Sequence, residues 1–223
     1  MLRKHKRLTK KELKKDPFVI FTAQVYEYLQ NEWKKLGSIV LTVVVVISLG
    51  IFFAKSSKKS EINAYDAALT ALQNDAPEAP DLLKAVVEKH GGSDKAGDAL
   101  IRLGNLYYQQ KDYDLSEKYF SQYVKKYSGD PLYDLNAYNG LGVVYEEKGE
   151  YKKAADTYKQ YISKYKESPF DTMMWLNIAK AYWLAGEKQA SKEYFTKIVD
   201  KPYDSSEKQE ALYYLEMLNL NKI

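Results

Sequence analysis

A segment with the same residue pattern occurs three times in the second half of the chain. Each copy has a small residue at the same point, Gly104, Gly142 and then Ala179, so successive copies lie 38 and 37 residues apart. Gly149 and Gly186 follow the first apolar stretch of two copies, where a helix is expected to end. Periods of about 20 to 50 residues are typical of repeat proteins, in which each unit buries its apolar face against its neighbours. The period therefore predicts an all-α fold of stacked helical hairpins, a solenoid.

The residue types at equivalent points resemble the tetratricopeptide repeat, which places Trp, Leu-Gly and Tyr on a first helix and Ala and Phe on a second helix before a proline. The matching residues are Trp175, Leu103-Gly104, Leu141-Gly142, Tyr107, Tyr145, Tyr182, Ala154, Phe120 and Phe195. Two features depart from the family: the period exceeds about 34 residues, and Ser116 and Ser191 stand where Ala is usual. We interpret the longer period as slightly longer helices rather than another fold. The repeats are predicted at about residues 97–131, 135–169 and 172–202.

Atypical units are expected at both ends of this domain, residues 61–223, because terminal units must present one solvated face. Residues 61–90 predict a degenerate first helix pair, separated by a turn at Pro77 and Pro80. Residues 206–220 predict a capping helix, with Ala211, Leu212, Leu215 and Leu218 facing the third repeat.

Residues 36–54 form an uncharged run that predicts a transmembrane helix. Its helical length of ~28 Å nearly matches a hydrocarbon core of about 30 Å. Lysines flank both ends, at Lys34 and Lys35 and again at Lys55, Lys58 and Lys59. A buried core helix and a cleaved signal peptide are the alternatives, but no polar face is present, and a signal peptide has an apolar region of only about 7 to 15 residues.

The charge of the chain changes sign across this run. Residues 1–60 carry 13 Lys and Arg against 4 acidic residues, which leaves 21 of the 34 basic and 26 of the 30 acidic residues in 61–223. Because basic residues are retained on the cytoplasmic side, we expect a single-pass protein of the bacterial inner membrane with a cytoplasmic N-terminus and a periplasmic or otherwise extracytoplasmic domain.

The segments around the span have different predicted roles. Residues 1–16 are predicted to be a disordered basic tail drawn to anionic lipid, and residues 55–60 a linker. Residues 17–35 predict an amphipathic juxtamembrane helix, with a plain extension of the membrane helix as the alternative.

The sequence offers little material for catalysis or for binding a metal or a nucleic acid. There is no cysteine, and His5 and His90 are the only two histidines. The basic tail, residues 1–15, holds no tyrosine, phenylalanine or tryptophan for stacking on bases. We therefore expect no enzyme activity, no cofactor, no metal and no specific nucleic acid.

The tetratricopeptide resemblance implies that the first helices of the repeats line a concave surface that binds proteins or unfolded polypeptides. We call the twelve positions that the family pattern assigns to this surface the candidate groove, although each is about equally well explained as a packing residue. They are Asp98, Ile101, Asn105, Tyr108, Asn136, Asn139, Val143, Glu146, Met173, Leu176, Lys180 and Trp183. The carboxylate clamp of cytosolic relatives is matched only at Asn105, so an acidic C-terminal peptide is not the expected ligand.

The order of basic tail, single span and acidic repeat domain is similar to the YfgM-like ancillary subunits of the bacterial Sec translocon, as is the end of the chain, residues 217–223. This resemblance implies association with SecYEG and transfer of exported polypeptides to periplasmic chaperones. The alternative is an envelope scaffold for outer-membrane assembly or cell division.

Overall fold

The computed structural model describes residues 16–202 and 204–219. These residues form α-helices and no β-strand, which confirms the all-α prediction. The predicted tail, up to residue 15, and residues 220–223 lie outside the described residues. The helices, in chain order, are α2 (Pro17–Gln73), α3 (Ala79–Lys89), α4 (Asp94–Gln109), α5 (Tyr113–Lys126), α6 (Pro131–Glu147), α7 (Tyr151–Lys164), α8 (Asp171–Leu184), α9 (Lys188–Val199) and α10 (Ser206–Asn219).

Helix α2 begins after Asp16, whose side chain accepts the N–H of Phe18 at 2.9 Å. It continues through the predicted juxtamembrane helix, span and linker. The predicted linker, residues 55–60, is helical, and it contains no glycine or proline that would interrupt a helix. The chain divides into two compact units, residues 1–59 and 60–223, so the last turns of α2 belong to the second unit. The boundaries of the predicted segments within α2 stay predictions.

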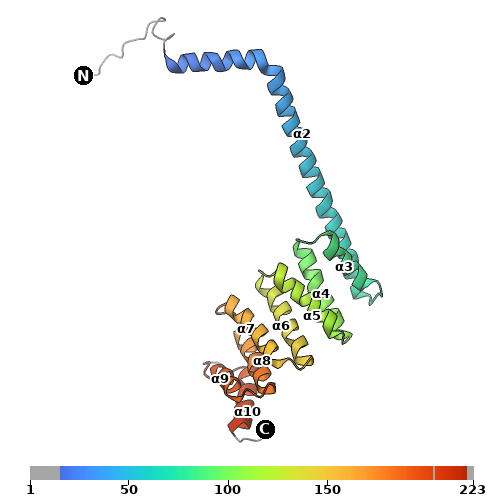
Figure 1. Cartoon of the computed structure of the whole chain (residues 1–223), viewed down its shortest axis with the longest axis vertical. Coiled ribbons are helices and arrows are strands. Elements are labelled where there is room, and N and C mark those ends of the chain that lie inside the picture. The colour runs from blue at the N-terminus through green and yellow to red at the C-terminus, as the bar shows by residue number, and fades with distance from the viewer. Residues whose placement is uncertain (1–15, 203, 220–223) are drawn as a thin grey trace, which may run out of the picture. The chain divides into compact units, whose positions relative to one another are not determined.

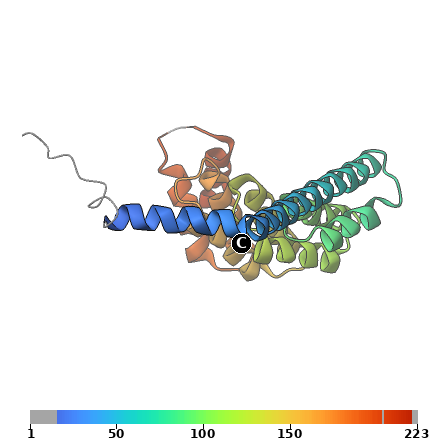
Figure 2. The same cartoon turned by 90° about the horizontal axis from the view of Figure 1, so that it is seen from above.

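The second unit is a succession of helix pairs (Figure 1). Helix α4 packs on α5, α6 on α7, and α8 on α9, while α5 against α6 and α7 against α8 join one pair to the next. Figure 2 shows the loop between α2 and α3, which precedes these pairs. Each pair thus buries the apolar face of the one before it.

The equivalent glycines of the first helices lie where a ring of the second helix crosses. A Cβ on Gly142 would lie 2.2 Å from the ring of Tyr158, and one on Gly104 would lie 2.8 Å from the ring of Phe120. Phe120 also reaches Gly140 of the next pair, where a Cβ would meet the ring at 2.4 Å. Such separations are well inside van der Waals contact, so the ring positions require glycine on the facing helix.

The two serines that depart from the family pattern are buried and make equivalent hydrogen bonds. Ser116 donates its hydroxyl to the carbonyl of Gly104 at 2.8 Å, and Ser191 donates to the carbonyl of Ala179 at 2.9 Å. Each bond ties the second helix of a pair to the first helix twelve residues earlier. A serine therefore fits this position as well as alanine does, because its hydroxyl has a partner in the core.

Each turn inside a pair contains a residue in the left-handed backbone region. Gly149 and Gly186 have φ of +74° and +75°, and Lys111 occupies the equivalent position of the first pair with φ of +59°. Glycine adopts this conformation without steric cost, whereas a side chain adds strain.

Helices at both ends of the solenoid pack on their neighbours. Tyr65 and Ala68 of α2 are buried in the same core as Leu83 and Val86 of α3. In α10, Ala211 is buried, and Leu215 and Leu218 pack against the last pair. The expectation for Leu212 was wrong: its side chain is 43% exposed. It follows Ala211 by one residue and is therefore rotated about 100° away from the core.

Candidate partner-binding groove

The N-terminal half of α6 is held by a fully buried carboxylate, that of Asp134, which the sequence analysis did not single out. Its Oδ1 accepts from the hydroxyl of Tyr123 at 3.0 Å and the N–H of Gly129 at 3.2 Å. Its Oδ2 accepts from Ser128 at 2.6 Å, Tyr165 at 2.6 Å and the ammonium of Lys164 at 2.7 Å. Burial raises the pKa of this carboxyl, but the hydrogen bonds from the side chains of Lys164, Ser128, Tyr165 and Tyr123 together outweigh burial and hold the pKa below its ordinary value. Asp134 thus joins α5, α6 and α7 and sets the position of α6 between its neighbours.

On α4, two of the four candidate-groove residues are buried by other parts of the chain. Asp98 is buried, accepts a hydrogen bond from the hydroxyl of Tyr65, and forms an ion pair with Arg102 at 2.5 Å. Ile101 is buried in the core. Asn105 is exposed, and the half-buried Tyr108 directs its hydroxyl toward Glu147 of α6 at 3.4 Å. The accessible part of α4 therefore lies toward its C-terminal half.

On α6, all four predicted positions keep exposed surface. Asn136 is exposed and donates its side-chain amide to the carbonyl of Leu132 on its own helix, at 3.2 Å. Asn139 and Val143 are half-buried. Glu146 accepts from the hydroxyl of Tyr158 at 3.1 Å, and burial raises the pKa of its carboxyl, while that hydrogen bond and the charge of Lys180 act in the opposite direction.

On α8, Leu176 is buried, whereas Met173, Lys180 and Trp183 are half-buried. Lys180 pairs with Glu210 of α10 at 2.9 Å. The ring of Trp183 meets that of Tyr214 edge-on, with centroids 5.1 Å apart. Helix α10 therefore extends the row of first helices and adds a carboxylate and an aromatic ring to it.

Nine of the twelve candidate-groove positions therefore keep surface open to a partner, while Asp98, Ile101 and Leu176 are packing residues in this structure. Three neighbouring side chains were missed as groove residues. Asn177 donates its amide N–H to Oδ1 of Asn139 at 2.9 Å, and Glu147 and Glu210 contact groove residues of the neighbouring helix. Their contacts join helices 30 to 39 residues apart in sequence, and no pattern along the chain marks them.

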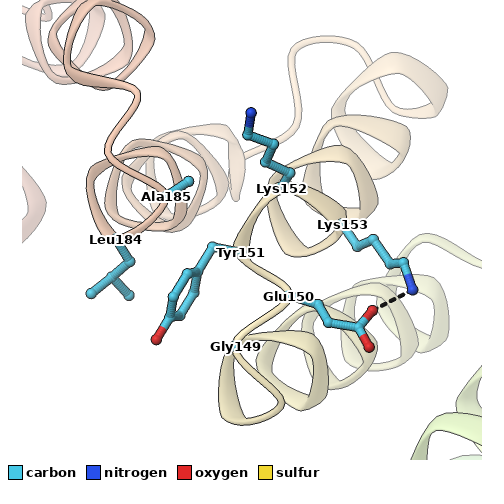
Figure 3. Close-up of a pocket in the computed structure, with 7 residues that line it drawn as sticks. All are labelled: Gly149, Glu150, Tyr151, Lys152, Lys153, Leu184 and Ala185. Atoms are coloured by element: carbon cyan, nitrogen blue, oxygen red, sulfur yellow. Dashed lines mark ion pairs between the residues drawn. The ribbon is translucent and has the colours of Figure 1, made fainter.

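Outside the candidate groove, a shallow hollow of about 530 Å³ lies at the turn between α6 and α7, where Gly149 to Lys153 face Leu184 and Ala185 (Figure 3). Lys153 is paired with Glu150, and Lys152 with Glu187 at 2.6 Å. The two lysines of this hollow are therefore already paired with carboxylates. Within residues 16–202 and 204–219, no three His, Asp or Glu side chains are grouped to hold a metal ion.

These features define a protein of stacked helical hairpins, and comparison with known proteins specifies the repeat. A family model described as tetratricopeptide repeat matches residues 95–167, and a second model of the same description matches residues 174–200. The chain therefore contains tetratricopeptide repeats, as the sequence analysis predicted.

Solved structures agree with this assignment at the level of the fold. A tetratricopeptide repeat protein from Parabacteroides merdae superposes with a TM-score of 0.61 at 16% identity, covering 73% of this chain and 61% of that one. MamA from Desulfovibrio magneticus RS-1 superposes with a TM-score of 0.56 at 18% identity, covering 73% of this chain and 85% of that one. No curated protein matches the chain.

Proposed function

We propose that this protein is a membrane-anchored module that binds polypeptides in the candidate groove. The observation that carries the proposal is the row of accessible amide, aromatic and charged side chains along α4, α6 and α8, beside a core whose buried polar groups are mostly paired. Stacked first helices of this kind present an extended surface to a peptide or a partner helix.

Helix α2 supports the proposed membrane anchor. It is long and apolar enough to cross a bilayer, with a mean hydropathy of 2.7 over its most apolar window, and none of that window is buried within the protein. Val40, Leu41 and Phe52 are among its exposed apolar side chains. A helix that leaves such side chains uncovered needs an apolar environment, and a bilayer supplies one.

The proposed site of action is the Sec translocon, where the protein would receive exported polypeptides on the outer side of the inner membrane and pass them to periplasmic chaperones. The similarity to YfgM-like subunits in segment order and charge supports this role. The excess of basic residues before the span supports a cytoplasmic N-terminus.

Site-specific photo-crosslinking in native membranes tests both the groove and the partner. A crosslinker placed at Asn105 or Asn136 is expected to capture nascent exported polypeptides and SecYEG subunits, whereas one at Gln122, exposed on α5, serves as a matched control. Equal capture at all three positions would contradict the groove. Capture of cell-division or outer-membrane assembly proteins without translocon subunits would favour the envelope scaffold.

Reporter fusions test the topology. A reporter that works only outside the cytoplasm is expected to be active at the C-terminus and inactive at the N-terminus. Activity of a cytoplasm-only reporter at the C-terminus would overturn the proposed localisation.

A further inference from the structure

Acidic side chains predominate in the C-terminal half of the candidate groove. Glu146 and Glu147 lie on α6 and Glu210 lies on α10, while Lys180 of α8 stands between them. Lys180 is paired with Glu210 at 2.9 Å, so its charge is already matched. Glu147 is exposed, and it accepts hydrogen bonds from the uncharged hydroxyls of Tyr108 and Tyr113, at 3.4 Å and 3.0 Å. This part of the groove therefore carries a net negative charge.

Two amides at the centre of the groove suit the main chain of a bound polypeptide. Asn177 donates to Asn139 at 2.9 Å, which uses one donor group and one acceptor group of the pair. The NH₂ group of Asn139 and the carbonyl of Asn177 are left, and these are the two groups that a peptide unit needs for its own C=O and N–H.

An aromatic surface lies one helical turn beyond the ion pair of Lys180 and Glu210. The ring of Trp183 packs edge-on against that of Tyr214, and both side chains are half-buried. Tryptophan and tyrosine offer large contact areas at low entropic cost and are enriched at protein interfaces. Apolar side chains of a partner thus have a surface to cover beside the charged one.

We propose that the groove selects polypeptide segments in which lysine or arginine alternates with apolar residues. This inference rests on the proposed function and names the chemistry of its ligand. The positive side chains would pair with Glu146 and Glu147, the apolar ones would cover the rings of Trp183 and Tyr214, and the main chain would bond to Asn139 and Asn177. An acidic segment would meet like charges, which oppose association and disfavour wrong partners.

The test uses the full chain in phosphatidylcholine nanodiscs, whose lipids carry no net charge, with empty nanodiscs as the blank. The probes are two fluorescent decapeptides built from leucine, serine and lysine or from leucine, serine and glutamate in the same order, each with a benzophenone for crosslinking. The binding variant combines Glu146→Gln and Glu147→Gln, which removes two charges and keeps the shape of each side chain and one of its two acceptor oxygens. The control variant combines Glu88→Gln and Glu193→Gln, which removes two charges from exposed positions on second helices.

The lysine peptide is expected to bind at least about tenfold more tightly than the glutamate peptide, with a preference that weakens at high salt. The binding variant should lose most of this preference, and the control variant should keep it, at unchanged thermal midpoints. Equal binding of both peptides, with crosslinks at α6 and α8, would overturn the charge selection and leave the groove in place. Crosslinks of the lysine peptide outside the groove would overturn the selection as well, and loss of polypeptide capture at Asn105 and Asn136 would separately refute the proposed function.

Discussion

Replacing Asp134 by asparagine tests whether the buried carboxylate holds the second repeat in place. The side chain of Asp134 is 0% exposed and accepts five hydrogen bonds, one of them from the ammonium of Lys164 at 2.7 Å. Asparagine keeps the shape but turns one acceptor oxygen into a donor, which then faces donors. Removing one partner of a fully buried charge pair costs about 3–5 kcal/mol. The side chain of Lys164 is 35% exposed, so we take the lower limit of about 3 kcal/mol. Because 1 kcal/mol shifts the midpoint of a domain of this size by about 2–4 °C, we expect a loss of roughly 6–12 °C.

The assay is thermal unfolding of the full chain in non-ionic detergent, followed by near-ultraviolet circular dichroism of the tyrosines. Asp114→Asn is the matched control, because Asp114 also binds a lysine, Lys148 at 2.8 Å, but its side chain is 89% exposed. An exposed pair contributes about 0–1 kcal/mol. A loss for Asp134→Asn no larger than that for Asp114→Asn would refute the reasoning.

The same carboxylate predicts a pH dependence. Because the pKa of Asp134 is lower in the folded protein than in the unfolded chain, its ionised form stabilises the fold above the unfolded pKa of about 3.9. That contribution is lost as the pH falls through the lowered folded pKa. Wild type should therefore lose more stability than Asp134→Asn between pH 6 and the acid limit of the assay, and parallel losses would contradict this account.

The remaining predictions concern single positions and use the same assay. Gly142→Leu should destabilise the domain by about 1–3 kcal/mol or more, the usual cost of overpacking, because even a Cβ would lie 2.2 Å from the ring of Tyr158. Gly129→Ala, in an open loop, is the control. An unchanged midpoint for Gly142→Leu would count against the packing of the Tyr158 ring on this glycine. Lys111→Gly should raise stability by up to about 1 kcal/mol, since φ of +59° strains a side chain, and a lowered midpoint would argue against strain at this turn. Ser116→Ala should cost about 1 kcal/mol by removing the hydrogen bond to the carbonyl of α4, and a neutral result would show that the hydroxyl contributes packing alone.

The repeat architecture was predictable because the information is local and periodic. Small residues 38 and 37 residues apart, followed by glycine at two of the turns, indicated paired helices, and the all-α fold confirmed them. The long apolar helix around residues 36–54 could also be predicted from the sequence. Its length and hydropathy are sums over neighbouring residues and do not depend on distant contacts.

The candidate groove stays a prediction, and the exposure of its residues was predicted only in part. The family pattern assigned Asp98 to the surface, yet Tyr65, 33 residues earlier, covers it in the structure. Lys111 likewise occupies a left-handed position that its residue type does not indicate. The burial of Asp98 depends on how α2 packs against α4, and the backbone conformation of Lys111 depends on the geometry of its turn. Neither can be read from a single sequence.

By itself, the sequence determined the helical hairpins, their period and the long apolar helix, because each follows from spacing along the chain. Only the tertiary structure decided that the carboxylate of Asp134 is buried among five donors, that Asn139 and Asn177 pair across two repeats, and that Glu210 comes next to Lys180. The physical reason is the same throughout. A hydrogen bond or ion pair forms only when two side chains meet within about 3 Å, and for residues about 30 to 40 positions apart, that meeting depends on how the helices are rotated and packed.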